Sequence, residues 1–163
     1  MEFFAEDMYR ENIMDHYKNP RNHGVIKNPD IGFADNNPLC GDEIGITVKL
    51  KKVHMMKNKI NKENIADKKE NMNIEKNAGK EEIWEYEIAE IKFDGKGCAI
   101  SQASASMLTE QVLGMKLAEV KKMKNDDVIK NLGIPLQPIR VKCALLGFKV
   151  LEAGIFLYES KNK

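Results

Sequence analysis

The stretch that decides the fold is GKGCAISQASASMLTE, residues 95–110. An alternating strand pattern enters it, two glycines and a cysteine follow, and six of the eight residues after Cys98 are Ala or Ser. This pattern predicts a strand that turns sharply into a helix, with the thiol of Cys98 at the helix start. The free N–H groups and the positive end of the dipole favour the thiolate there. An inert buried cysteine that closes the turn is the alternative.

The composition is that of a chain with a substantial core and no strong net charge. The chain has 163 residues, of which 42% are hydrophobic and 31% charged, and its formal net charge is +1. We therefore expect a single domain over residues 1–163, with no nucleic-acid partner. No apolar run approaches the roughly 20 residues of a membrane span, and the first residues are acidic, so we expect a cytoplasmic protein without a membrane partner. Three cysteines in a reducing compartment fit metal or sulfur chemistry better than disulfides.

Alternating apolar residues predict an antiparallel hairpin that leads into the opening stretch. Apolar and polar residues alternate over 43–50 and again over 83–94, and a shorter strand is expected at 32–34. The return strand ends just before Cys98. The hairpin therefore delivers Cys98 to the same end of the sheet from which Cys40 departs.

Helical patterns lie on both sides of the predicted hairpin. They cover residues 4–17, 98–114, 117–120, 126–133 and 144–157. His16, near the end of the first helix, and His23, in the turn that follows it, are interpreted as structural, because neither has a second ligand at metal spacing nearby.

Residues 51–82 are rich in Lys and Asn and show no persistent hydrophobic period. We interpret this segment as a flexible solvated loop between the two long strands, with His54 on the surface. A basic arm for nucleic acid is the alternative. It is disfavoured because the segment has no aromatic residue to stack on bases and because acidic residues dilute its charge.

The other two cysteines have charged neighbours: Asp42 follows Cys40, and Arg140 and Lys142 precede Cys143. In Cys40-Gly41-Asp42 a thiol and a carboxylate can face one small volume, although a turn aspartate bonded to its own backbone is the alternative. Cys143 follows a Pro-framed loop, residues 134–142, and is expected at the beginning of the final helix. The helix start and the basic residues Arg140 and Lys142 both favour its thiolate. An inert cysteine on an apolar helix is the alternative there.

The three cysteines are too far apart in sequence for a zinc knuckle or ribbon, whose ligands come as close pairs. A strand end, a strand-to-helix turn and a loop-to-helix turn can nevertheless converge at one edge of a sheet. Three thiolates with Asp42 would make a site that combines soft sulfur ligands with one hard oxygen ligand. Thiolates suit zinc or iron–sulfur, and a hard carboxylate leaves a site that can release its metal.

Four ordered motifs carry a resemblance to a known family. They are YRENIMDHYKNPRNHG at 9–24, CGD at 40–42, GCAI followed by ASAS at 97–106, and a cysteine at 143 before an apolar helix. Together they resemble the iron–sulfur cluster assembly scaffolds IscU, the N-terminal domain of NifU, and SufU. The resemblance implies an α+β fold with a three-stranded antiparallel sheet covered by helices, and a long charged hairpin loop here at 51–82.

The resemblance also implies a function and residue roles. A cysteine desulfurase hands persulfide sulfur to the scaffold, iron is supplied, and a [2Fe–2S] cluster forms and passes to apo-proteins. Cys40, Cys98 and Cys143 would be cluster ligands, Asp42 the ligand that keeps the cluster labile, and Cys143 the persulfide acceptor. Such scaffolds also bind zinc at the same residues. No turnover of a small substrate is implied, and a cluster shared by two copies of the chain is compatible with this role.

The chain departs from the family pattern at Lys142, in the spacing and chaperone motif before Cys143, and in the long segment 51–82, and Lys142 favours an alternative function. Lys142 stands where IscU proteins have a histidine ligand, as in SufU, and it can steer anions or pair with Asp42 but is a poor ligand while protonated. The spacing between Cys98 and Cys143 is short, as in IscU. The segment 136–140, LQPIR, differs from the chaperone-binding motif of IscU, so the resemblance does not extend to a dedicated Hsp70 partner. The alternative function is a SufU-like, zinc-dependent sulfur transfer. A structural zinc domain used as an interaction module is a third hypothesis, disfavoured by the large apolar content.

Overall fold

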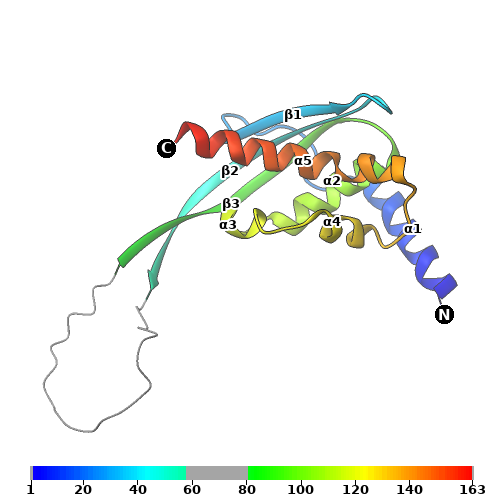
Figure 1. Cartoon of the computed structure of the whole chain (residues 1–163), viewed down its shortest axis with the longest axis horizontal. Helices are drawn as coiled ribbons and strands as arrows, with labels where there is room; N and C mark the ends of the chain where they lie inside the picture. Colours follow the sequence, from blue (N-terminus) through cyan, green and yellow to red (C-terminus); the bar gives the residue numbers. More distant parts are fainter. Residues whose placement is uncertain (1, 58–80, 163) are drawn as a thin grey trace, which may run out of the picture.

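The computed structural model describes residues 2–57 and 81–162 (Figure 1). Its helices and strands follow in the order α1 (Glu2–Lys18), β1 (Ile31–Asn37), β2 (Asp42–Lys57), β3 (Glu81–Lys96), α2 (Ala99–Val112), α3 (Leu117–Val120), α4 (Asn125–Leu132) and α5 (Pro138–Lys161). The expected α+β architecture is confirmed: helices lie against a three-stranded antiparallel sheet.

The sheet has the strand order β1-β2-β3, with β2 at its centre. The β2–β3 register pairs Glu43 with Lys96, which confirms the predicted hairpin, and a register shift lies between Lys49 and Leu50. Both long strands exceed the prediction, because β2 continues to Lys57 and β3 begins at Glu81. The interpretation of 51–57 and 81–82 as loop is therefore wrong. The rest of that predicted loop, 58–80, lies outside the described residues.

One face of the sheet buries the core against α2 and α5. Alternate β2 side chains, Ile44, Ile46 and Val48, are almost fully buried, as expected for a strand with one covered face. They belong to the same apolar cluster as Leu108 of α2 and Leu151 of α5. Figure 1 shows α5 running along the sheet and the β2–β3 hairpin extending beyond the helices. Within the described ranges, no helix has the length and hydropathy needed to cross a membrane.

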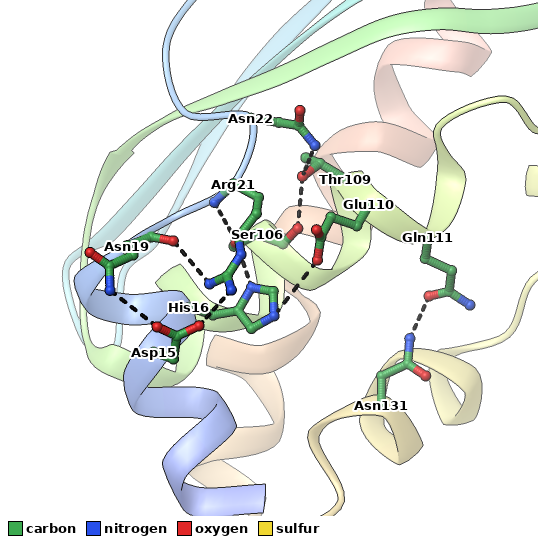
Figure 2. Close-up of polar contacts among 10 residues, drawn as sticks. All are labelled: Asp15, His16, Asn19, Arg21, Asn22, Ser106, Thr109, Glu110, Gln111 and Asn131. Atoms are coloured by element: carbon green, nitrogen blue, oxygen red, sulfur yellow. Dashed lines mark hydrogen bonds and ion pairs between the residues drawn. The ribbon is translucent and has the colours of Figure 1, made fainter.

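A polar contact fixes the end of α1 to α2 (Figure 2). His16 is buried, and its Nδ1 lies 2.8 Å from Oγ of Ser106, which also accepts the backbone N–H of Arg21 at 2.8 Å. Because that hydroxyl accepts from Arg21, its own proton can be donated to Nδ1, and the second ring nitrogen faces Glu110 at 3.7 Å. The structural interpretation of His16 is confirmed.

Candidate metal centre

Three turns of the chain converge at one end of the sheet. The β1–β2 register pairs Asn37 with Asp42, so the tight turn between these strands carries Cys40. The β2–β3 register places the end of β3 opposite the start of β2, and Cys98 follows directly. The N-terminal part of α5 adds Cys143 from a third direction. The convergence expected from the predicted hairpin is therefore present.

Two thiols and one carboxylate form a tight group of potential metal ligands in the described part of the chain. The Sγ atoms of Cys40 and Cys143 lie 3.3 Å apart. One oxygen of Asp42 joins them, and the three ligand atoms all lie within 4.8 Å of one another. Two ligands of one zinc ion are separated by less than about twice the bond length, which is about 2.3 Å for Zn–S and 2.0–2.2 Å for Zn–O, so small side-chain movements would let one ion bind all three atoms.

Cys98 joins this group through Asp42. Its Sγ lies 3.6 Å from Oδ2 of Asp42, and its backbone N–H donates to Oδ1 at 3.0 Å. Cys98 is the N-cap residue of α2, which confirms the expected thiol at a helix start. Its side chain is half-buried, whereas that of Cys40 is exposed.

The carboxylate of Asp42 is almost entirely buried, with 3% of its surface exposed. Burial by itself raises the pKa of Asp42, but hydrogen bonds led by those from Cys40 and the backbone of Cys98 outweigh it, so that pKa is lowered. Cys143 and Ser101 add smaller contributions in the same direction. A buried carboxylate kept ionised in this way is a ready ligand for a cation.

Cys143 lies deeper in its helix than the sequence predicts, and its thiol is not favoured as a thiolate. Helix α5 begins at Pro138, so Cys143 lies in the second turn, where its Sγ donates to the carbonyl oxygen of Ile139 at 3.7 Å. Burial, first of all, and hydrogen bonds with Cys40 and Asp42 raise the pKa of Cys143 above its ordinary value. The expected thiolate at a helix start is therefore wrong for the metal-free protein, and bound metal would have to displace this proton.

Lys142 does not take part in the tight group. Its side chain is exposed, and among the described residues no ion pair joins it to Asp42. The carboxylate of Asp42 instead accepts a hydrogen bond from the backbone N–H of Cys98, in the turn between β3 and α2.

Gly97 and Ser101 lie next to Asp42, and the sequence did not predict that either residue contacts this carboxylate. A methyl group on Gly97 would lie 2.8 Å from Oδ1 of Asp42 and 2.5 Å from Oγ of Ser101, so the carboxylate and the hydroxyl both press against this glycine. Ser101 is fully buried and donates to the carbonyl oxygen of Cys98 at 3.0 Å. A serine in an Ala/Ser-rich helix start gives no signal for such a contact, because the contact depends on a residue far away in sequence.

The family model described as "NifU-like N terminal domain" matches residues 8–69 and 71–163, which is nearly the whole chain. The chain belongs to this NifU-like family. Among curated relatives of this NifU-like chain, the zinc-dependent sulfurtransferase SufU of Bacillus subtilis is 33% identical over 96% of this chain and 95% of the relative. The iron–sulfur cluster assembly scaffold protein IscU of Escherichia coli is 29% identical over 95% of this chain and 97% of the relative.

A solved structure supports the fold of this NifU-like chain. It is a SufU from Fervidobacterium islandicum, described as an iron–sulfur cluster assembly scaffold protein for the SUF system. The two structures have a TM-score of 0.57 at 26% identity, over 89% of this chain and 94% of the other.

Proposed function

We propose that this chain is a scaffold on which a [2Fe–2S] cluster is assembled from iron and persulfide sulfur and then transferred to apo-proteins. Cys40, Asp42, Cys98 and Cys143 are its cluster ligands. The single observation that carries the proposal is the gathering of the Cys40 and Cys143 sulfurs with the Asp42 carboxylate within 4.8 Å, next to the sulfur of Cys98. Membership in the NifU-like family supports it.

The donor set fits both the assembly and the release of a cluster. Thiolates are the usual ligands of iron–sulfur clusters. A carboxylate is a harder ligand and a poorer match for the iron of a sulfur-rich site, so the Asp42 position is the weakest and most exchangeable of the four. The three residues of the tight group come from the β1–β2 turn, the first position of β2 and helix α5. Cys40 is exposed and therefore accessible to a partner.

Cys143 is the proposed acceptor of sulfur from a cysteine desulfurase. Its sulfur, once deprotonated, attacks the terminal sulfur of the desulfurase persulfide. A new S–S bond forms on Cys143 while the S–S bond on the desulfurase breaks, and the desulfurase cysteine leaves as a thiolate. Because Cys143 is only 1% exposed, docking of the desulfurase has to open the contact between Cys143 and the exposed Cys40. Lys142 beside it would attract the anionic persulfide.

The second candidate function is a zinc-dependent sulfur transfer. The 33% identity to the Bacillus subtilis protein of that description favours it, as does Lys142 in place of a histidine ligand. In this function zinc is bound by the same group of residues, one thiolate takes up the persulfide, and no cluster forms. Both functions involve a desulfurase as partner, but only the scaffold passes a cluster to recipient proteins.

Metal analysis and sulfur trapping on the same preparation distinguish the two functions. The scaffold predicts that anaerobic incubation with iron, cysteine and a desulfurase gives a coloured protein whose cluster moves to an apo-ferredoxin. Tightly held zinc, persulfide on a cysteine and no transferable cluster would favour sulfur transfer instead. Mass spectrometry of alkylated Cys40→Ser, Cys98→Ser and Cys143→Ser variants identifies the acceptor. Persulfide that persists in Cys143→Ser would contradict its role.

A further inference from the structure

Ser101 occupies the first turn of α2 and faces the candidate metal centre from inside the fold. Its side chain is 1% exposed, and its Oγ donates to the carbonyl oxygen of Cys98 at 3.0 Å. The same hydroxyl lies on the Asp42 side of Gly97 and helps to lower the pKa of that carboxyl group. Gly97 brings the two groups together, because a Cβ there would lie within 2.8 Å of both Ser101 Oγ and Asp42 Oδ1.

The one proton of the Ser101 hydroxyl is donated to the carbonyl oxygen of Cys98, and the Asp42 carboxylate is a second possible acceptor on the same side of Gly97. A serine hydroxyl rotates freely enough to serve either of them, and a carboxylate forms a stronger, charge-assisted hydrogen bond than a backbone carbonyl. The Asp42 side chain already accepts the N–H of Cys98 on Oδ1, the oxygen that lies against Gly97. Oδ2 is directed toward the sulfur of Cys98. The N–H of Cys98 and the hydroxyl of Ser101 therefore lie on the Oδ1 side of the carboxylate, and the sulfur of Cys98 lies on the Oδ2 side.

We propose that Ser101 is a positioning residue for Asp42, fixing the carboxylate so that Oδ2 is the oxygen presented to bound metal. The inference rests on the proposed function, since it requires metal to bind at Asp42. Ser101 itself does not touch the metal. Removal of a group that orients a metal ligand in this way typically lowers metal affinity about 10- to 100-fold.

Ser104 provides a matched control. It is a second buried serine on α2, and its Oγ donates to the carbonyl oxygen of Ala144 at 2.6 Å, without contact to Asp42. Ser104→Ala and Ser101→Ala remove the same atom from the same helix. A loss of metal affinity in both variants would indicate an effect on the packing of α2. A loss of metal affinity in Ser101→Ala alone would indicate an effect on the position of Asp42.

The experiment is an anaerobic titration of the metal-free protein with Co²⁺, followed by the visible d–d bands that report the ligand set. We expect Ser101→Ala to bind Co²⁺ about tenfold more weakly than wild type, with shifted bands, and Ser104→Ala to match wild type. In the Asp42→Ala background, the additional Ser101→Ala change should have no effect on affinity or spectrum. That result separates positioning of Asp42 from a general structural role.

Two outcomes would overturn the inference: wild-type affinity and spectrum in Ser101→Ala, or an equal loss with and without Asp42. If Ser101→Ala does not fold, as judged by circular dichroism, Ser101→Thr carries the test, because it keeps the hydroxyl. We expect Ser101→Thr to retain wild-type affinity, and a tenfold loss in this folded variant would contradict the role of the hydroxyl. Failure of wild type to bind Co²⁺ through thiolates would contradict the proposed function itself.

Discussion

The backbone N–H of Cys98 donates a 3.0 Å hydrogen bond to Oδ1 of Asp42, across 56 residues of chain. The carboxylate thereby accepts, from a separate strand, the backbone N–H of the N-cap residue of α2, a helix without a side-chain cap hydrogen bond of its own. A proposed metal ligand is thus also part of the helix start, and the geometry of the metal centre depends on how the β3–α2 turn meets β2.

Gly97→Ala should weaken metal binding and leave the fold intact. Its new methyl group would lie 2.8 Å from Asp42 Oδ1 and 2.5 Å from Ser101 Oγ, so both side chains must move away from their present positions. We expect at least a tenfold loss of zinc affinity, measured by competition with a chromogenic chelator. Gly32→Ala is the control, because its methyl group meets neighbours only at ordinary contact distances. A wild-type zinc affinity in Gly97→Ala would show that the space beside Gly97 has no influence on metal binding by Asp42.

The stability of the metal-free protein should fall as the pH is lowered through the range around 6.5. Burial, together with the charge of Arg21, lowers the pKa of His16 despite the opposing charge of Glu110. Between that lowered pKa and the ordinary value of about 6.5, the unfolded chain binds a proton that the folded chain does not. The contribution of His16 to the free energy of unfolding is therefore complete above about pH 6.5 and decreases below it.

Urea unfolding at pH 7.5 and pH 5.5 measures this dependence. His16→Gln should be less stable than wild type at pH 7.5, by about 1–3 kcal/mol for the lost buried contact with Ser106, and should lose less stability on acidification. His23→Gln, at an exposed position, is the control. An identical pH dependence in wild type and His16→Gln would contradict the buried neutral imidazole.

Removal of metal should not unfold the protein. The core between the sheet and helices α2 and α5 contains large apolar side chains that are almost fully buried, including Phe93 and Phe148, and none of the four proposed ligands belongs to this apolar cluster. We expect chelation to leave the far-ultraviolet circular dichroism and the cooperative thermal transition in place. A protein that unfolds on chelation would instead be a structural zinc domain.

Much of the candidate site could be predicted from the sequence because antiparallel pairing is local. The alternation that leads to Gly95 placed the end of β3 beside the start of β2, and this brought Cys98 to Cys40 and Asp42. The start of α5 was missed because Pro138 looks like part of a loop, although proline is favoured at the first position of a helix.

Other features had no signal in the sequence. The continuation of β2 beyond Leu50 was hidden, because Lys51, Lys52 and His54 are exposed and exposed strand residues need no alternation of apolar and polar types. The burial of Cys143 and the contact between Ser101 and Asp42 depend on how helices pack against a distant strand. Local pattern carries no information about either.

The most direct test of the account is the absorption spectrum and iron content of protein reconstituted anaerobically, with wild type and Asp42→Ala side by side. The account predicts about two irons per binding unit in both and the sulfide-to-iron absorption of a [2Fe–2S] cluster. It predicts that the cluster of Asp42→Ala persists about tenfold longer in the presence of an apo-acceptor or chelator, because the exchangeable carboxylate is gone. A wild-type protein that binds no iron and sulfide, or an Asp42→Ala cluster with an unchanged lifetime, would contradict it.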